Sequence, residues 1–367
     1  MSSPKVLFLI GQLVRGGAEQ QLYNLLAHSH LNAVVVSFSP GGYWANPIRE
    51  LGYPVIELER RGRMEVRRLW RVSALIREHR PDLIYIFVDG ISGLYGRLGV
   101  LLARHHRLII GQRSHPIYFP RWYRTLLPGM NKAVKAVICN SYSARDYLVG
   151  HRLAPTAKTL VIPNGIDARR FGQPSQTWPW PEAWHGKQII GTVTHLTPAK
   201  SPETFVRLAA CGRKRHPDLR FALIGGGPLR EEIEALVKSQ GVNDILWLAG
   251  ERQDVPDLLA TMDIFVLASR TEGMPNAVME AMAAGLPCVV TDVGDCAQVV
   301  SHQETGIVVP PDDLNLMTDA VVQLANDESR RQSMGVRGQK RIENEFDVRV
   351  MASRYEDVFA RLARVDS

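Results

Sequence analysis

The sequence predicts an α/β protein with two Rossmann-like, doubly wound parallel-sheet domains that face each other across a cleft. Its 367 residues suit two domains, each with its own hydrophobic core. Short apolar runs alternate with helical patterns in two separate rounds, which is typical of parallel sheets covered by helices. Between the rounds, residues 171–187 hold five prolines or glycines and three tryptophans without a regular apolar period. We therefore predict an N-terminal domain over 1–170, a linker over 171–187 and a C-terminal domain over 188–345.

Six strands are expected in the first domain. Each is an apolar run of four to seven residues, the length of a buried strand. They lie at 5–10, 33–38, 55–58, 83–87, 107–111 and 134–140, with helical patterns between several of them. A last helical stretch, 346–367, follows the second round of strands, and we expect it to pack back on the first domain.

The second domain repeats the alternation. Strands are predicted at 189–193, 221–224, 245–248, 264–268, 288–291 and 306–309. Helices are predicted between them at 202–216, 229–240, 255–261 and 275–284. Because ligands of such sheets bind beyond the carboxyl ends of the strands, the loops at those ends are where we look for function.

The composition, 45% hydrophobic and 22% charged, is that of an ordinary globular protein. No apolar run is long enough to span a membrane. The apolar run 5–10 is soon followed by Arg15 and Glu19, which indicates a first strand rather than a secretory signal. Four cysteines without CxxC spacing favour reduced thiols and a cytoplasmic location.

The most informative segment is 269–292. It places Glu272 before, and Glu280 inside, a helix that Pro275 can begin. Backbone N–H groups at the start of a helix point at a region of positive potential that binds anions. Two carboxylates beside that region can accept hydrogen bonds from hydroxyl groups, so the segment predicts a nucleotide-sugar pocket. The alternative, two solvated surface glutamates, fits poorly because the residues around Glu280 are small and apolar.

Two further loops follow predicted strands and carry candidate phosphate ligands. Gly16 and Gly17 open a helix, where backbone conformations with φ > 0 and the missing Cβ would admit a phosphate; a plain tight turn is the alternative. His195 and Lys200 follow the strand at 189–193 and offer a donor and a cation to an anion, unless Lys200 is a solvated surface residue.

A third loop, which begins at Gly225, is similar to a dinucleotide fingerprint, with Glu251 as a ribose acceptor. The third glycine of that fingerprint is missing, so we disfavour an oxidoreductase. We interpret the loop as one wall of the nucleotide pocket.

Taken in order, the motifs closely resemble the retaining glycosyltransferases of family 4, which have the GT-B architecture. The motifs are Gly16-Gly17-Ala18-Glu19, residues 161–167, residues 196–200, the Glu272 and Glu280 pair at E-x7-E spacing, and residues 305–310. They span nearly the whole chain. The resemblance implies transfer of a sugar, with retention of anomeric configuration, from a nucleotide-sugar donor to a hydroxyl group.

The resemblance also implies roles for individual residues. Glu280 would bind the ribose hydroxyls and Glu272 the hydroxyls of the donor sugar. Lys200 would neutralise the diphosphate as its bond to the sugar breaks. Arg252 would line the base pocket. The other implied donor-binding residues are Gly16, Gly17, His195, Gly225, Gly273, Met274, Pro275 and Asn276. His115 would lie near the reacting sugar, so the expected catalytic residues are His115, Lys200 and Glu272.

The sequence departs from the family pattern at three positions. The family usually has arginine where His195 stands, and a diphosphate beside His195 would favour its charged form. Asp295 and Gln298 stand where the family commonly has glycine and glutamate. No Asp-x-Asp metal site is apparent, so we expect no metal and no cofactor.

The expected donor is a UDP-sugar, with a GDP-sugar as the alternative. The expected acceptor is a glycan or lipid-linked hydroxyl in polysaccharide, lipopolysaccharide or glycolipid synthesis. A GT-B epimerase or phosphorylase is an alternative function, and a basic nucleic-acid-binding protein is a second one.

The charge is divided unevenly along the chain. Residues 1–170 contain 24 Lys+Arg and 10 Asp+Glu, and the remainder contains 20 and 27. Segments 60–71 and 118–127 mix cations with aromatic residues, which suits an anionic membrane surface, although a solvated helix face is the alternative. We predict peripheral docking on the inner face of a membrane. The nucleotide-sugar pocket disfavours nucleic acid as the partner.

Overall fold

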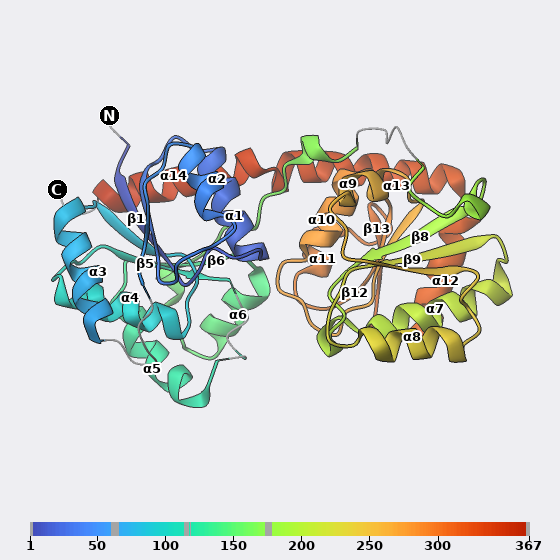
Figure 1. Cartoon of the computed structure of the whole chain (residues 1–367), viewed down its shortest axis with the longest axis horizontal. Helices are drawn as coiled ribbons and strands as arrows, with labels where there is room; N and C mark the ends of the chain where they lie inside the picture. The colour runs from blue at the N-terminus through green and yellow to red at the C-terminus, as the bar shows by residue number, and fades with distance from the viewer. Residues whose placement is uncertain (1–2, 60–65, 114–116, 118, 173–177, 365–367) are drawn as a thin grey trace. The chain divides into compact units, whose positions relative to one another are not determined.

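The computed structural model describes residues 3–59, 66–113, 117, 119–172 and 178–364, and the chain divides into two compact units (Figure 1). The first unit comprises the chain up to Gly165 and again from Val348 onward, and the second comprises Ile166–Asp347. Each unit is built on one parallel sheet with helices on both faces. The predicted fold of two parallel-sheet α/β domains is confirmed.

The first sheet has seven strands in the order β3-β2-β1-β4-β5-β6-β7. Six of them were predicted: β1 (Lys5–Ile10), β2 (Asn32–Ser37), β3 (Val55–Glu57), β4 (Leu83–Ile86), β5 (Leu108–Gln112) and β6 (Ala136–Cys139). The seventh, β7 (Thr159–Val161), pairs with β6 at the edge and was not predicted. Three residues are too few to show an apolar period.

Alternate residues of β1 supply two separate cores, because successive strand side chains point to opposite faces. Val6, Phe8 and Ile10 pack with α1 (Gly17–Ala27), α2 (Ala45–Glu50) and α14 (Val348–Arg364). Leu7 and Leu9 pack in the core formed with α3 (Val66–His79), α4 (Ile91–Leu102) and α6 (Tyr142–Gly150). The remaining helix, α5 (Arg121–Lys132), lies between β5 and β6 in the chain.

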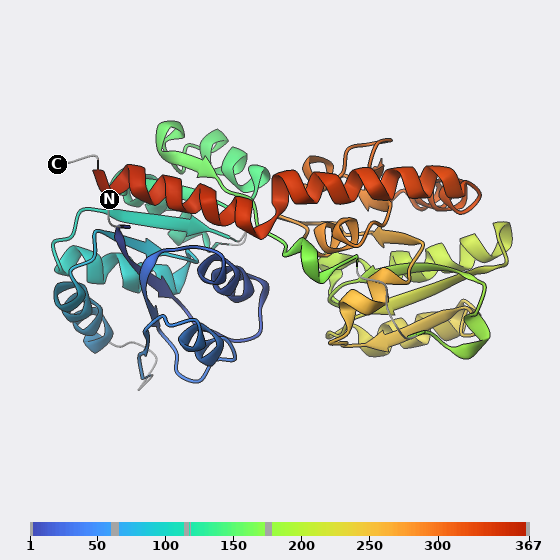
Figure 2. The same ribbon diagram turned by 90° about the horizontal axis from the view of Figure 1, so that it is seen from above.

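The C-terminal helix α14 completes the first core (red, nearest the C-terminus in Figure 2). Its buried residues follow helical spacing: Val348, Met351, Ala352, Tyr355 and Phe359. The Tyr355 hydroxyl lies 3.3 Å from that of Tyr85 on β4 and accepts a hydrogen bond of 2.9 Å from Arg113 Nη2. Helix α14 is thereby joined to the strands of the first unit.

The second sheet has six strands in the order β10-β9-β8-β11-β12-β13, and all six were predicted. They are β8 (Gln188–Val193), β9 (Leu219–Ile224), β10 (Leu246–Gly250), β11 (Ile264–Leu267), β12 (Cys288–Thr291) and β13 (Gly306–Val309). The helices are α7 (Pro202–Arg215), α8 (Arg230–Ser239), α9 (Val255–Ala260), α10 (Asn276–Ala283), α11 (Cys296–Val299), α12 (Leu314–Ala325) and α13 (Glu328–Arg341).

The segment 171–187, predicted as a linker, belongs to the second unit. Trp180 and Trp184 are each only 4% exposed and join its core, and Trp180 Nε1 donates to Thr261 Oγ1 at 3.0 Å. The chain instead passes between the units at 165/166 and 347/348. Tryptophan side chains bury a large apolar area, which explains why a segment without periodicity still packs firmly.

A buried ion pair fixes the helices at the end of β4. Arg97 on α4 donates from Nη2 to Asp89 Oδ2 at 3.0 Å and to Asn131 Oδ1 on α5 at 3.0 Å. The Tyr123 hydroxyl of α5 donates to Asp89 Oδ1 at 2.8 Å. The Asp89 and Arg97 side chains are 0% and 7% exposed, so each charge depends on these partners.

We predict that Arg97→Met destabilises the first unit by about 3–5 kcal/mol, because it leaves the Asp89 carboxylate buried without its cation. The control is Arg145→Met, which removes one side of the exposed Arg145–Asp146 pair and should cost about 0–1 kcal/mol. Scanning calorimetry measures both, since it resolves the two units if they melt separately. Equal costs for the two variants would contradict the bracing role of Arg97.

Candidate active site

The site lies where the order of the second sheet reverses, between β8 and β11. From β8 the sheet continues to β9 on one side and to β11 on the other, so the loops after β8 and β11 diverge from neighbouring strand ends. Open α/β sheets bind ligands at such a switch point. The loop after β8 carries Lys200, and the loop after β11 carries Glu272.

The structure brings Lys200 and Glu272 into direct contact. Lys200 Nζ lies 2.7 Å from both Glu272 carboxylate oxygens, and Ser269 Oγ donates to Glu272 Oε1 at 2.6 Å. The Glu272 side chain is 6% exposed and that of Lys200 is 28% exposed. The carboxylate is therefore largely covered, and the lysine side chain is partly exposed to solvent.

Backbone contacts hold the two loops together. The amides of Arg270 and Thr271 both donate to the carbonyl oxygen of Ala199, at 2.9 and 3.2 Å. Lys200 ends a short 3₁₀ turn, Pro198–Lys200, and Ser201 after it has a left-handed backbone with φ +48°. This bend redirects the chain into α7 directly after the lysine.

Two ion pairs reinforce the same junction. Arg270 Nη1 donates to Glu203 Oε1 at 2.8 Å, and Arg270 Nε donates to Asp312 Oδ1 at 3.0 Å. Ser201 Oγ donates to the same Glu203 oxygen at 3.0 Å. Lys200 is thus positioned by neighbours on both sides of the loop.

The helix after Glu272 begins as predicted, with Pro275 at its N-cap and α10 running from Asn276 to Ala283. The Asn276 amide is already occupied, because it donates to the Met274 carbonyl at 3.1 Å. Within the described ranges, no acceptor is recorded for the amides of Gly273, Met274 and Ala277. These three groups can bind an anion at the helix start.

Glu280 is the one charged residue of α10, and Val278, Met279, Ala281, Met282 and Ala283 around it are buried. The residue as a whole is half-buried, and none of the residues that the structure describes makes a hydrogen bond to its carboxyl group. Desolvation raises the pKa of Glu280 to about 7, and the positive charge of Arg170 opposes that shift. A carboxyl group without a partner among the described residues is suited to accepting hydrogen bonds from the hydroxyl groups of a ligand.

Ser269 and Gly294 support Glu272, and the sequence did not single them out as site residues. Gly294 has φ +55°, and a Cβ there would lie 2.6 Å from the Glu272 carbonyl carbon. The amide of the buried Asp295 donates to the Gly273 carbonyl at 3.0 Å. The spacing of Ser269 three residues before Glu272 was the available signal, but its meaning depends on the loop conformation.

The glycines of the loop after β9 allow one loop to pass closely over another. Gly225 has φ +136°, and a Cβ there would overlap the Thr194 carbonyl oxygen. A Cβ on Gly227 would lie 2.7 Å from the Leu196 carbonyl oxygen. The loop therefore packs against the segment that carries His195, which is exposed.

Arg252 lies just after β10 and is bound by its neighbour. Its Nε and Nη2 donate to the two carboxylate oxygens of Asp254 at 2.8 and 2.6 Å, and its guanidinium lies 5.5 Å from the centre of the Trp247 ring. It remains partly exposed.

The remaining predicted residues belong to the first unit. His115 lies outside the described residues. The expectation of φ > 0 at Gly16 and Gly17 is wrong, since Gly16 has an extended φ of −162° and Gly17 is helical. A Cβ at Gly16 would overlap Oε2 of Glu19, the far end of a flexible side chain that can move aside. Burial raises the pKa of Glu19, against its own backbone amide and the charge of Arg113.

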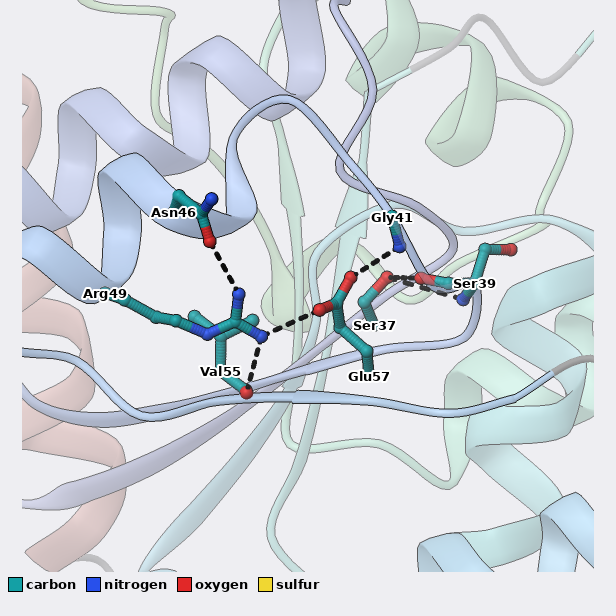
Figure 3. Close-up of polar contacts among 7 residues, drawn as sticks. All are labelled: Ser37, Ser39, Gly41, Asn46, Arg49, Val55 and Glu57. Atoms are coloured by element: carbon teal, nitrogen blue, oxygen red, sulfur yellow. Dashed lines mark hydrogen bonds and ion pairs between the residues drawn. The ribbon is translucent and has the colours of Figure 1, made fainter.

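Figure 3 shows the polar contacts that hold the loop after β2. Glu57 on β3 accepts from the Gly41 amide and from Arg49 Nη2, both at 2.7 Å, and the hydrogen bond from Arg49 is the main cause that lowers the pKa of Glu57. The Trp44 amide then donates to the Leu13 carbonyl at 2.9 Å. The loop after β1, which leads to Gly16, is therefore bound to the loop after β2, which the Arg49–Glu57 ion pair holds in place.

In the described parts of the chain, no group of three or more His, Cys, Asp or Glu side chains is arranged to hold a metal ion. Within the same parts, no helix is both long enough and apolar enough to cross a membrane.

Two family models match the chain in succession. Residues 15–170 match the model described as Glycosyltransferase Family 4, and residues 187–327 match the one described as Glycosyl transferases group 1. The two matches cover most of the first unit and most of the second, including the loops after β8 and β11.

Individual relatives agree with the family models. The chain is 26% identical over 310 residues to UDP-Gal:alpha-D-GlcNAc-diphosphoundecaprenol alpha-1,3-galactosyltransferase of Escherichia coli, which covers 80% of this chain and 79% of the relative. It is 30% identical over 251 residues to the lipopolysaccharide core biosynthesis mannosyltransferase LpsB of Rhizobium meliloti, with 65% and 68% covered. Its fold matches Anabaena HepE in complex with UDP at a TM-score of 0.85 and 20% identity, over 97% of this chain and 100% of that chain.

We predict that Glu280→Gln stabilises the second unit above pH 7. The raised pKa means that the folded chain binds a proton more tightly than the unfolded one, so wild-type stability falls as pH rises from about 4.5 to about 7. The neutral amide removes this loss, a gain of about 1–3 kcal/mol at pH 8 and little below pH 5. Urea unfolding at both pH values measures it, with the exposed Glu343→Gln as control. No gain at pH 8 would contradict the desolvation of Glu280.

Proposed function

This chain belongs to glycosyltransferase family 4, and we propose that it transfers a sugar with retention of anomeric configuration. It is a GT-B glycosyltransferase. The proposed donor is a nucleotide-sugar, with UDP favoured over GDP, and the proposed acceptor is a hydroxyl group of a glycan or lipid-linked molecule in cell-surface polysaccharide or glycolipid synthesis. The observation that carries the proposal is the Lys200–Glu272 pair, followed in the chain by three amides and by Glu280, for which the described residues supply no hydrogen-bond partner.

The two glutamates take different parts of the donor. Glu280, half-buried and without a hydrogen-bond partner among the described residues, accepts hydrogen bonds from the ribose hydroxyls. Glu272 accepts from hydroxyls of the donor sugar, held in place by Ser269. The amides of Gly273, Met274 and Ala277 receive the diphosphate. Asn276 contributes its side chain, because its backbone amide already donates to the Met274 carbonyl.

Lys200 supplies the catalytic charge. A bound diphosphate competes with Glu272 for its ammonium group, and negative charge on the leaving phosphate grows as the sugar C1–O bond breaks. Lys200 then stabilises the leaving group, while Glu272 exchanges the lysine for sugar hydroxyls. The acceptor hydroxyl attacks C1 from the face that the diphosphate leaves and passes its proton to the departing phosphate oxygen.

The other proposed contacts surround this centre. Exposed His195 donates a hydrogen bond to the diphosphate, and Arg252 and the Gly225 loop line the base pocket. We also propose Gly16 and Gly17 as phosphate ligands and His115, which lies outside the described residues, as a catalytic residue. Since a lysine and helix amides supply the positive charge, we propose that transfer needs no metal ion.

The choice of UDP is supported by relatives. The Escherichia coli galactosyltransferase is named for a UDP-sugar and an undecaprenol-linked acceptor, and the Anabaena structure holds UDP. The first unit, with 26 Lys+Arg against 12 Asp+Glu in the sequence, suits an anionic acceptor presented at the inner face of a membrane. We propose a cytoplasmic protein that binds that face peripherally.

The donor is tested by thermal shift with a panel of UDP-, GDP- and ADP-sugars. We predict the largest stabilisation with a UDP-sugar and its loss in Glu280→Ala, because hydroxyl recognition by the carboxylate disappears. The control Glu343→Ala, an exposed residue of the same unit, should shift like wild type. Stabilisation of Glu280→Ala equal to wild type would remove Glu280 from the donor site.

The mechanism is tested with Lys200→Ala. We predict a fall in kcat of about 10²–10³-fold with a smaller change in the donor Kd, because the charge is needed most in the transition state. Lys238→Ala, on an exposed lysine, should keep wild-type kcat, and circular dichroism checks the fold of both. Chelation with EDTA should leave the wild-type rate unchanged. A chelator-sensitive rate would contradict metal independence.

Analysis of the products separates the candidate functions. Nuclear magnetic resonance of the new linkage should show the anomeric configuration of the donor. Inversion would contradict a retaining transferase, and sugar processing without any hydroxyl acceptor would favour an epimerase or phosphorylase.

A further inference from the structure

One face of the first sheet is covered by helices that present exposed leucine and tryptophan side chains. On α4, Leu98, Leu101 and Leu102 are 40%, 72% and 37% exposed. Their spacing of three and four residues places them on one side of the helix. The chain thus has an apolar stripe that faces away from its own core.

The opposite side of α4 explains why the leucines cannot turn inward. Glycine recurs there at every third position, at Gly93, Gly96 and Gly99. A Cβ on Gly96 would lie 2.8 Å from Ile86 Cδ1 of β4, and one on Gly99 would lie 2.6 Å from Val72 Cγ1 of α3. The glycines therefore form the packing side of α4, and the leucines are left on the outer side.

The neighbouring helices add tryptophans. Trp70 on α3 is 59% exposed, and Trp122 and Leu126, one turn apart on α5, are 50% and 48% exposed. α3 packs against α4, and Arg97 of α4 donates to the Met130 carbonyl and to Asn131 of α5, so the three helices are neighbours (Figure 1). We call Trp70, Leu98, Leu101, Leu102, Trp122 and Leu126 the leucine–tryptophan surface.

The charge along α4 and α5 has one sign. From residue 90 to residue 145 the sequence contains seven arginines and two lysines but no aspartate or glutamate. Arg104, Arg121 and Lys132 are exposed at the ends of α4 and α5. A second copy of the chain, meeting this face with the same face, would bring like charges together. Nucleic acid would match the charge but would leave the leucines without a partner.

We propose that the leucine–tryptophan surface docks on an anionic lipid bilayer. The α4 leucines enter the boundary between headgroups and acyl chains, the tryptophans lie at the level of the headgroups, and the arginines and lysines meet lipid phosphates. The proposal rests on the peripheral membrane location given above and names the surface responsible. It does not depend on the donor chemistry.

The test is flotation of the full chain with vesicles of phosphatidylcholine containing about 30% phosphatidylglycerol, without donor or acceptor. Wild type should float at about 50 mM NaCl and more weakly at about 500 mM, since salt screens the charges but not the apolar contact. Leu98→Ser/Leu101→Ser should weaken partitioning at least about tenfold at both salts. Arg121→Ser/Lys132→Ser should weaken it mainly at low salt.

The matched control is Leu316→Ser/Val336→Ser, which removes two side chains of similar exposure, 45% and 67%, from the second unit. It should float like wild type. Equal flotation of the α4 variant and this control overturns the proposal, and so does flotation of wild type with phosphatidylcholine alone to the same extent. A wild-type dimer that becomes monomeric in the α4 variant, without vesicle binding, assigns the surface to a second copy instead.

The outcome is separable from that of the proposed function. The α4 variant should keep the thermal shift by a UDP-sugar, which also shows that it folds. Flotation of wild type without any nucleotide-sugar shift would leave the surface standing and remove the proposed function. A shift without flotation would do the reverse.

Discussion

The contact between Lys200 and Glu272 is the constraint on which the second unit's site depends. It joins the loops after β8 and β11 at the point where the sheet order reverses. Because Lys200 Nζ contacts both oxygens of Glu272, the position of the carboxylate determines the position of the ammonium group. Every contact that holds Glu272 therefore also positions Lys200. Ser269 holds the carboxylate from one side, and the Ala199 carbonyl ties the two backbones together. Gly294 lets the loop after β12 press against the Glu272 backbone, which leaves that segment little freedom to move away.

Two glutamates eight residues apart end up in opposite electrostatic states. Glu272 is covered but matched by a cation, so its burial is compensated. Glu280 has a raised pKa because apolar neighbours desolvate its carboxyl group. No hydrogen-bond partner among the described residues offsets the cost of burying its charge. A chain selected only for stability would place a neutral residue in α10. The retained carboxyl is what a ligand with paired hydroxyl groups would need, and stability sacrificed at one position is a common sign of a binding site.

Much of this arrangement could be predicted from the sequence because it is local. The apolar runs fix twelve of the thirteen strands, and Pro275 fixes the start of α10 to one residue. The failures share a tertiary cause. Gly16 has an extended backbone as the N-cap of α1, beside the Glu19 side chain of that helix, and has no positive φ. Residues 171–187 lack a regular apolar period, yet Trp180 packs in the core of the second unit and donates a hydrogen bond to Thr261. Ser269 acquires its role only when the loop bends it toward Glu272, which no spacing rule encodes.

The glycines of α4 show how a constraint inside the first unit can create a surface outside it. Glycine in a helix interior costs up to about 1 kcal/mol per residue relative to alanine, so three at regular spacing oppose helix formation. The compensation is close approach to β4 and α3, where no side chain would fit. With the glycines packed inward, positions 98, 101 and 102 of the helix face outward, where a polar residue would suit water best. The chain has leucines there instead, in a stretch without a single carboxylate. Packing explains the orientation of α4 but not its leucines, so their explanation has to lie outside the chain. An anionic lipid bilayer, with an apolar interior and a negatively charged surface, can contact both the leucines and the arginines.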